Sequence, residues 1–390
     1  MQLSVLKVQP ARAWTGTVYI RADGSIDPSD APISRVEDAY VLTGNISSSA
    51  DGIVIERSNM TLDGASYAIQ GSGGGDYRGI DLSGRRNVTI MNVYIRSFDS
   101  GIYLDGSLEN KIDKNNITEN ECGIFFWNSI ASCDYNNISR NRIVRNSGYG
   151  IYGYTFSYNT YISNEITENW AGIMLDNSSN NTISGNTLFN NTLYGGWFYG
   201  CSGSNITRNE IALNGDCGIR IHGGSAYNII SENTIVQNQQ YGLWSSITIN
   251  RIFHNNFFDN ANQAYTESTG DVWDDGYPSG GNYWSGYSGS DLMYGLYQNE
   301  TGSDGIGDTS YIIDGNNRDN YPLIYPVSPL QGDVNRDNKV DGKDVAIVAK
   351  AYNTKPGDPL WDPRADANRD LKVDGKDIAI VAKYYNTHYP

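Results

Sequence analysis

The stretch GIYLDG at residues 101–106 decides the fold, because phrases of the same kind return throughout the chain. They recur as GIFF at 123–126, GIYGY at 150–154, GIMLDN at 172–177 and GIRIHG at 218–223. The glycines that open such phrases stand at positions 52, 79, 101, 123, 150, 172, 196, 218 and 242, so successive steps are 22 to 27 residues long. A recurrence at this interval indicates a protein built from stacked repeats.

Between the glycine phrases run segments in which apolar and polar residues alternate around Asn. Examples are NVTIMNVYI at 87–95, NTYISNEIT at 159–167 and SNITRNEIA at 204–212. A period of two predicts short β-strands, and a helical period is absent from these segments. A unit of this size cannot bury its apolar face alone, so only a stack of units forms a core. The repeat therefore predicts an all-β fold, a parallel β-helix solenoid.

Composition divides the chain into a long repeat region and smaller parts. Residues 14–270 are expected to form the β-helix with an N-terminal cap. Residues 271–326 are rich in Gly, Asp and aromatics without periodicity, which predicts an irregular C-terminal cap over the open strand edge. Residues 327–331 form a linker, and 332–390 a separate calcium-binding module. Residues 1–13 end in Ala-Arg-Ala and are either a signal-peptide remnant or an ordinary chain terminus.

The charge balance narrows the class of partner. Among 390 residues, 44 are acidic and 28 basic, which gives a net charge of -16. Nucleic-acid binding needs clustered Lys and Arg, so no nucleic-acid partner is expected. The balance suits a surface protein that collects divalent cations. Because no apolar run approaches the roughly 20 residues of a spanning helix, no membrane span is expected either.

The repeats resemble the right-handed parallel β-helix repeats of NosD-type periplasmic proteins and of carbohydrate-binding and sugar-hydrolase proteins. GGNYWSGYSGSDLMYG at 280–295 and DNYPLIYP at 319–326 are similar to the C-terminal segment of archaeal NosD-like surface proteins. The resemblance covers about residues 14–326 and implies export to the cell surface. It implies copper handling only for one branch of the family. His222, His254 and His388 are scattered, without a Met or Cys cluster, so a copper site is poorly supplied.

Alternation within the glycine phrases predicts which side chains point outward. The first and third residues after Gly are expected to point inward and the second and fourth outward. The outward residues include a stripe with these members: Tyr103, Phe125, Trp127, Tyr152, Tyr154, Phe198, Arg220 and Trp244. Such a stripe is too apolar to face water without a role. It is a stacking platform for a polysaccharide, a protein interface, or a surface that the cap or a loop covers.

The same columns hold the polar residues that a glycan or a reaction would need. Asp105, Asp176, Arg220 and His222 would supply hydrogen bonds to a sugar. Asp176, Arg220 and His222 are also the candidate catalytic residues of a lyase or hydrolase acting on a uronate polymer. A glycosidase needs two carboxyl groups about 5 to 9.5 Å apart. Asp105 and Asp176 are three coils apart, which is nearer ~14 Å, so enzyme activity is uncertain and a non-catalytic role is favoured.

Four cysteines occur in the repeat region: Cys122, Cys133, Cys201 and Cys217. Cys122 and Cys217 are four coils apart, about 19 Å, which is too far for a disulfide. Cys133 lies in an inserted loop within reach of Cys122, and Cys201 shares a coil with Cys217. We favour buried free thiols, but the sequence leaves the pairing open.

The C-terminal module carries the strongest chemical signal. GDVNRDNKVDGKDVAIVAKAYN at 332–353 returns as ADANRDLKVDGKDIAIVAKYYN at 365–386. Each copy has oxygen ligands at positions 1, 3, 5, 7, 9 and 12 of an EF-hand-type loop, with position 7 acting through its backbone carbonyl. The ligands of the two loops are Asp333, Asn335, Asp337, Lys339, Asp341 and Asp344, and Asp366, Asn368, Asp370, Lys372, Asp374 and Asp377. Position 12 is Asp instead of Glu, and position 6 is not Gly.

One helix is expected after each loop, at DVAIVAKAYN and DIAIVAKYYN. This pattern resembles a type I dockerin over residues 331 to about 387. The resemblance implies calcium as cofactor and a cohesin module as partner, and two near-identical halves would permit either orientation. Gly342-Lys343 and Gly375-Lys376 replace the small hydroxyl residues of the family, so the identity of the partner is in doubt. A calcium-stabilised cap without a partner is the alternative.

Together these features predict a secreted or cell-surface protein with a structural, adhesion or assembly role. The dockerin-like module would attach it to a cohesin-like partner or polymerise it with another copy of itself. The alternative is a polysaccharide-binding or polysaccharide-degrading β-helix anchored by the same module.

Overall fold

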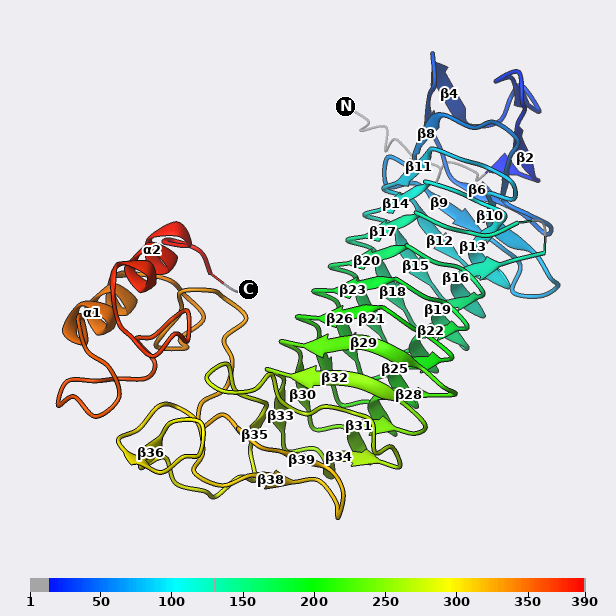
Figure 1. Ribbon diagram of the computed structural model, residues 1–390. Coiled ribbons are helices and arrows are strands. Elements are labelled where there is room, and N and C mark those ends of the chain that lie inside the picture. Colours follow the sequence, from blue (N-terminus) through cyan, green and yellow to red (C-terminus); the bar gives the residue numbers. More distant parts are fainter. Residues whose placement is uncertain (1–13, 130, 389–390) are drawn as a thin grey trace, which may run out of the picture. The chain divides into compact units, whose positions relative to one another are not determined.

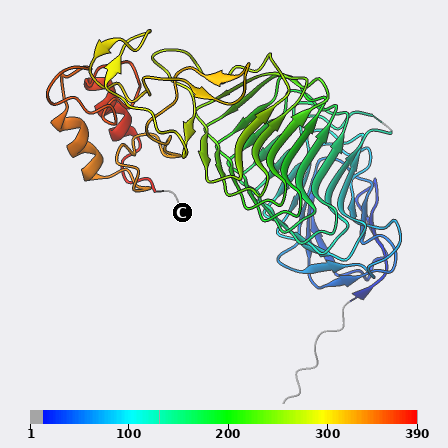
Figure 2. The same ribbon diagram turned by 90° about the horizontal axis from the view of Figure 1, so that it is seen from below.

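The computed structural model describes residues 14–129 and 131–388, which fall into two compact units, one through Phe156 and one from Ser157 onward. In each unit successive coils stack so that their strands form three parallel sheets (Figures 1 and 2). The predicted all-β parallel solenoid is confirmed. Residues 1–13, with the predicted signal-peptide remnant, lie outside the described residues.

The strands of the first unit form three sheets. One sheet has the order β1 (Trp14–Thr15), β6 (Ile46–Ser47), β9 (Ala68–Gln70), β12 (Tyr94–Arg96), β15 (Asn116–Thr118) and β18 (Arg142–Val144). The second has β3 (Ile26–Asp27), β2 (Val18–Ile20), β7 (Ile53–Ile55), β10 (Arg78–Asp81), β13 (Ser100–Asp105), β16 (Cys122–Trp127) and β19 (Tyr149–Tyr154). The third has β4 (Ile33–Val36), β5 (Ala39–Leu42), β8 (Met60–Asp63), β11 (Val88–Met91), β14 (Lys111–Asp113) and β17 (Asn137–Ser139). Antiparallel pairs β2–β3 and β4–β5 begin the stack.

The second unit continues with the same three kinds of sheet. One has β21 (Glu165–Thr167), β24 (Thr187–Phe189), β27 (Glu210–Ala212), β30 (Thr234–Val236), β33 (Asn256–Phe258) and β35 (Tyr283–Trp284). The next has β22 (Ala171–Asp176), β25 (Tyr194–Tyr199), β28 (Cys217–His222), β31 (Tyr241–Ser245) and β34 (Asn262–Thr266). The third has β20 (Thr160–Ile162), β23 (Thr182–Ser184), β26 (Asn205–Thr207), β29 (Ala226–Ser231) and β32 (Ile249–Phe253). Two antiparallel hairpins follow, β36 (Met293–Tyr294) with β37 (Glu300–Thr301), and β38 (Tyr311–Ile312) with β39 (Arg318–Asp319).

Buried asparagines at the corners of the coils join each coil to the next. Both the backbone N–H and the side-chain amide of Asn186 donate to Oδ1 of Asn209, at 2.9 and 3.0 Å. Asn209 donates in the same way to Asn233 and also reaches the carbonyl of Ile183 at 2.9 Å. These amides satisfy backbone groups at corners where no strand pairs them.

Three such ladders cross the second unit. They comprise Asn164, Asn186, Asn209, Asn233, Asn255 and Asn282; Asn169, Asn191, Asn214, Asn238 and Asn260; and Asn159, Asn181, Ser204, Asn228, Asn250 and Asp271. The first unit begins equivalent ladders at Asn110, Asn115 and Asn120.

The recurring glycine of the phrase marks a close approach between coils. A Cβ atom on Gly195 would lie 2.6 Å from the carbonyl oxygen of Gly218, one coil further on. Gly101 meets the same obstacle at Gly123, also at 2.6 Å. Any larger residue would push the two coils apart, so the phrase returns with its glycine wherever coils stack at this spacing.

The cap after the last coil is organised by the buried carboxylate of Asp319. It accepts hydrogen bonds from the backbone of Asn282 at 2.6 Å, from the indole of Trp284 at 2.9 Å and from the backbone of Tyr321 at 3.1 Å. Asn282 ends an asparagine ladder, and Trp284 stacks on Phe257 with ring centroids 4.4 Å apart. Burial raises the pKa of Asp319 to about 7.

The C-terminal module contains the two α-helices found among the described residues, α1 (Gly342–Lys350) and α2 (Gly375–Lys383). Each helix follows one predicted loop, as expected. Neither has the length or apolar character needed to cross a bilayer, and the described residues contain no other helix. A core of valines and alanines with Trp361 against it holds the module together.

Replacing Asn209 with Leu tests the ladders. The backbone N–H of Asn186 and the carbonyl of Ile183 lose their partners, so the free energy of unfolding should fall by about 2–4 kcal/mol. The midpoint of guanidinium unfolding measures this loss. Asn205→Leu, on the exposed face of β26, is the matched control and should leave the midpoint nearly unchanged. Equal midpoints for the two variants would show that the asparagine hydrogen bonds do not contribute to the stability of the β-helix.

Asp319 makes stability depend on pH. Its pKa of about 7 in the folded state exceeds the ordinary value of about 3.9, so its contribution is fully present below pH ~4 and is lost as pH rises toward 7. The thermal midpoint of the wild type, relative to that of Asp319→Asn, should therefore fall between pH 4 and pH 7. A difference between the two proteins that stays constant with pH would contradict the assignment.

Candidate functional site

The structure corrects one member of the predicted outward stripe. Phe198 is buried at 1% exposure, and the neighbouring Trp197 and Tyr199 point outward instead. The strand pairing gives the reason, because Gly196 pairs with Ile173 and therefore occupies the inward Ile position. Two successive glycines, Gly195 and Gly196, made the register of this coil ambiguous in the sequence.

In the first unit the predicted stripe forms a self-stacked array. Phe125 stacks on Tyr152 at 5.3 Å between ring centroids and on Trp127 at 5.8 Å. Trp127 also lies 5.9 Å from Tyr154. Nearly parallel rings at this separation overlap in an offset stack. The rings therefore use part of their faces on each other, while Trp127 and Tyr154 remain 38% and 39% exposed.

One further stripe residue of the first unit, Tyr103, and the polar candidate Asp105 are already covered. Tyr103 is 8% exposed, because the guanidinium of Arg78 lies 3.6 Å from its ring centroid. Asp105 is also buried, and it accepts hydrogen bonds from the backbone and hydroxyl of Ser129. Its predicted role as a hydrogen-bonding partner of a sugar is wrong for this reason.

The second unit has an open aromatic cluster on β25, β28 and β31, which we call the Arg220 cluster: Tyr194, Trp197, Tyr199, Arg220, His222 and Trp244. The guanidinium of Arg220 lies 4.6 Å from the Trp244 ring centroid and 5.8 Å from that of Trp197. His222 stacks on Trp197 at 6.0 Å and meets Trp244 edge-on at 5.8 Å. Alternation on adjacent strands brings the side chains from Trp197 onward to one face. Tyr194, which is only 7% exposed, contacts Arg220 through its hydroxyl from the start of β25.

The candidate catalytic residues do not converge into one reacting centre. Arg220 and His222 lie two residues apart on β28, but Asp176 lies on β22. The strand β25 runs between them, and its Tyr199 pairs with Asp176 on one side and with His222 on the other. Two strand spacings separate Asp176 from His222 by about 10 Å. Burial raises the pKa of Asp176, which accepts a hydrogen bond from Asn177 at 2.8 Å. The arrangement suits binding better than proton transfer across one bond.

The two loops of the C-terminal module have nearly the same internal geometry. In the first, Asp344 accepts hydrogen bonds from the backbone N–H groups of Asn335 at 3.1 Å and Asp341 at 2.8 Å. The corresponding distances at Asp377 of the second loop are 3.2 and 2.8 Å. Both carboxylates are fully buried and cap the helices that follow. The aspartate at position 12 thus ties the loop to its helix.

The carboxylates of the second loop crowd together. Burial, together with the charges of Asp377 and Asp370, raises the pKa of Asp366 to about 7. Oδ1 of Asp370 is buried without a hydrogen-bond partner. In the described chain, no three His, Cys, Asp or Glu side chains come close enough to hold a metal by themselves. The crowded oxygens and the unpaired Asp370 atom nevertheless fit a hard cation that also uses amide and backbone oxygens.

Position 6 of each loop keeps the backbone that an EF-hand glycine would adopt. Asn338 and Leu371 both have φ of 64°. Asn tolerates this left-handed region, whereas a bulky residue such as Leu is strained there. The replacement of glycine at position 6 therefore adds a side chain but leaves the backbone conformation of the loop unchanged.

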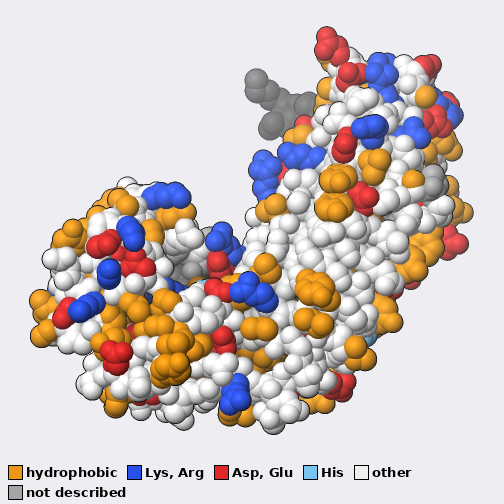
Figure 3. Space-filling view, viewed as in Figure 1, with side chains coloured by type: hydrophobic (Ala, Val, Ile, Leu, Met, Phe, Trp, Pro, Cys, Tyr) orange, Lys and Arg blue, Asp and Glu red, His pale blue; other side chains and the backbone are white. Residues whose placement is uncertain are grey.

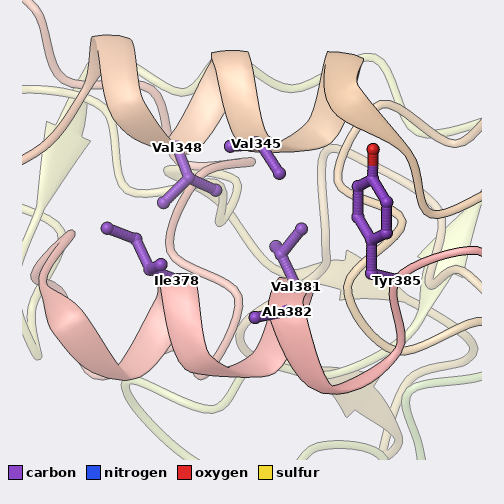
Figure 4. Close-up of a pocket in the computed structure, with 6 residues that line it drawn as sticks. All are labelled: Val345, Val348, Ile378, Val381, Ala382 and Tyr385. Atoms are coloured by element: carbon purple, nitrogen blue, oxygen red, sulfur yellow. The ribbon is translucent and has the colours of Figure 1, made fainter.

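An apolar groove of about 330 Å³ lies between α1 and α2, lined by Val345, Val348, Ile378, Val381, Ala382 and Tyr385. The two helices contribute matching residues (Figure 4). Val345 is 41% exposed and Ile378 40%, and the pair Tyr352 and Tyr385 is 50% and 47% exposed. The sequence repeat predicted two alike halves, but only the packing of the helices creates the groove.

Histidine and cysteine donors are dispersed. His222 lies in the Arg220 cluster, and the ring of His254 forms a hydrogen bond of 2.8 Å with the carbonyl of Ser279. The backbone of His388 forms an isolated antiparallel β-bridge with that of Lys339. Burial lowers the pKa of His254 to about 4. The four cysteines are buried thiols outside any disulfide, and burial raises the pKa of each. Among the described residues these donors do not gather into a group of three.

Charged side chains are dispersed as well. On the face shown in Figure 3, acidic and basic side chains alternate in small groups among hydrophobic ones, without an extended basic region.

Comparison with protein-family models gave two matches. The model described as periplasmic copper-binding protein (NosD) matches residues 16–192 and 153–289. The dockerin type I domain matches residues 331–386. No curated protein matches the chain significantly.

Solved structures with a similar fold share little sequence. A point mutant of the periplasmic alginate epimerase AlgG is 14% identical, with a TM-score of 0.50 over 65% of this chain and 82% of that one. The Dettilon tailspike protein is 17% identical, with a TM-score of 0.49 over 66% and 62%. The mannuronan C-5 epimerase AlgE6 A-module of Azotobacter vinelandii is 17% identical, with a TM-score of 0.42 over 60% and 78%. At these identities the likeness concerns the fold alone.

Calorimetric titration tests the two loops. We expect two calcium ions per wild-type chain, and Asp370→Ala should weaken one site about tenfold or more because a loop ligand is lost. Asp358→Asn, a carboxylate of the same module outside both loops, is the control and should keep two sites. Two unchanged sites in Asp370→Ala would show that this loop does not bind calcium through Asp370.

Proposed function

Because the chain belongs to the NosD family through its β-helix and carries a type I dockerin domain, we propose that it is an exported, non-catalytic surface component. The dockerin module attaches the protein to a cohesin-like partner. The outer face of the second unit then presents the Arg220 cluster to a polysaccharide. The β-helix itself acts as the rigid support of that face.

The apolar groove between α1 and α2 is the observation that carries the attachment. A module of this size has few apolar residues to bury, yet Val345, Ile378, Tyr352 and Tyr385 remain substantially exposed. An exposed apolar surface with two matching halves suits a partner that docks by hydrophobic contact. Its near-symmetry supports docking in either of two orientations.

Calcium is the proposed cofactor of this attachment. The loop oxygens of Asp333, Asn335, Asp337, the Lys339 carbonyl, Asp341 and Asp344 would hold one ion, and the equivalent set from Asp366 to Asp377 a second. A bound ion relieves the repulsion among the buried carboxylates and stabilises the loops that begin both helices. Attachment is therefore expected to depend on calcium. Copper is not part of the proposal, because its usual donors are dispersed.

The Arg220 cluster supports a polysaccharide as the second contact more than it supports catalysis. Aromatic rings with Arg and His donors suit the apolar faces and oxygen atoms of sugars, whereas Asp176 stands apart from His222. Another copy of the chain is the alternative occupant of the surface. A lyase or hydrolase would need a second acid or base beside His222.

Binding to purified cohesin modules tests the attachment. Either Val345→Asp or Ile378→Asp alone should retain binding, because the other half still docks, and the double variant should lose it. Val36→Asp, which changes an equally apolar but distant and 74% exposed residue, is the control. Surface plasmon resonance with calcium and with chelator gives the readout. Retained binding by the double variant would exclude the groove.

Light scattering separates attachment to a partner from polymerisation. A monomer both with calcium and with excess chelator is expected if the partner is a different protein. Growth into large particles only with calcium would instead make another copy of the chain the partner.

A further inference from the structure

The guanidinium of Arg220 has an incomplete set of partners. Nη1 donates to the hydroxyl of Tyr194 at 2.5 Å, and the other contacts are with the rings of Tyr194, Trp197 and Trp244. Nε is buried without an acceptor. Among the described residues no carboxylate lies within ion-pair distance of Arg220. A guanidinium has five N–H donors, and the Nη N–H groups that Tyr194 does not use are left for an external acceptor.

Arg78 in the first unit is an arginine in similar aromatic surroundings whose ionic partner comes from the same chain. Its guanidinium also lies on an aromatic ring, 3.6 Å from the centroid of Tyr103. There, however, Asp81 supplies a carboxylate at 2.5 Å. Arg78 and Arg220 thus share an aromatic support, and they differ in that only Arg78 has an anionic partner from its own chain. The missing partner of Arg220 is therefore a carboxylate-like group.

His222 adds a second donor to the same face. The indole N–H of Trp197 donates to Nε2 of His222 at 2.7 Å, so Nε2 accepts and the proton of the neutral ring is on Nδ1. Burial, with Arg220 nearby, lowers the pKa of His222 and favours this neutral form. His222 lies two residues from Arg220 on β28, about 7 Å along the strand. The spacing suits two oxygen atoms on one sugar unit.

The aromatic rings on either side of Arg220 suit the sugar rings of a ligand that carries such a carboxylate. Trp197 and Trp244 pair with Arg220 from the strands on either side, and Tyr265 continues the column beyond Trp244. Aromatic side chains held on a rigid sheet bind the C–H faces of sugar rings with little loss of side-chain freedom. Asp176, in the column of His222, would repel an anion and so limits the site on that side.

We propose that the Arg220 cluster binds an acidic polysaccharide, with a uronate carboxylate on the Arg220 guanidinium and a sugar oxygen on Nδ1 of His222. This rests on the proposed function and names the class of polysaccharide. The net charge of -16 disfavours the approach of polyanions in general, so the attraction has to come from the Arg220 guanidinium itself. The Trp244 ring supports the sugar but does not choose between acidic and neutral chains.

Matched tetrasaccharides test the proposal with the full-length protein. The acidic probes are tetramers of β-1,4-linked glucuronate and mannuronate and of α-1,4-linked galacturonate. Each is compared with the neutral hexose tetramer of the same linkage, which differs at carbon 6. Isothermal titration calorimetry should give at least one acidic tetramer that binds about tenfold more tightly than its neutral counterpart, the contribution of a charge-assisted hydrogen bond.

Three variants assign the preference to residues. Arg220→Gln should abolish the preference for the acidic tetramer, and Trp244→Ala should weaken acidic and neutral tetramers alike. Arg208→Gln, which removes an exposed arginine paired with Glu232 elsewhere in the same unit, should leave binding unchanged. Thermal midpoints confirm that each variant folds. If Arg220→Gln does not fold, Trp244→Ala and the acidic-to-neutral ratio of the wild type still decide the question.

The possible failures are distinguishable. Equal binding of acidic and neutral tetramers would overturn the uronate assignment and leave the proposed polysaccharide contact standing. No binding to any tetramer, with attachment to cohesin intact, would overturn both the assignment and the polysaccharide contact. If hexaglutamate bound as tightly as the acidic tetramer, the ligand of the cluster would be an acidic protein segment, and the proposal would be overturned.

Discussion

The hydrogen bonds between side-chain amides of stacked asparagines are the constraint on which the β-helix depends. A coil must turn three corners, and at each corner backbone N–H and carbonyl groups leave the sheets that would otherwise pair them. In the ladder through Asn186, Asn209 and Asn233, the side-chain oxygen of Asn209 accepts from Asn186 of the preceding coil. Its side-chain amide donates back to the Ile183 carbonyl of that coil and forward to Asn233 of the next one. Because a buried unpaired backbone group is costly, these positions tolerate few other residues. The regular spacing of Asn in the sequence follows from this requirement.

Once the corners and the inward columns are satisfied, the outward positions of each strand are free to vary. The protein uses that freedom differently in its two units. In the first unit aromatic rings stack on one another, and Asp81 completes the partners of Arg78. In the second unit the rings surround Arg220 without a carboxylate of the same chain. A similar scaffold thus carries one arginine that has a carboxylate partner and another that has none among the described residues.

The dockerin module follows a different physical principle, since its core is small and its loops are acidic. Asp344 and Asp377 cap helices while their neighbours crowd the loops with negative charge. Burial, together with this crowding, raises the pKa of Asp366. Loops of this kind are ones that a bound cation would stabilise, and the short helices leave Val345 and Ile378 substantially exposed.

The sequence by itself determined the parallel β-helix, the two calcium-type loops and the helix after each. These are local patterns, because strand alternation, the coil repeat and the ligand spacing lie within short windows of residues. Only the tertiary structure decided that Phe198 points inward, that Asp105 is covered by Ser129, and that Arg220 lacks the carboxylate that Arg78 has. The register of a coil with two adjacent glycines and the partners of a charged side chain depend on neighbouring coils, more than 20 residues away. No window of sequence contains those contacts, so the open site emerges only when the coils stack.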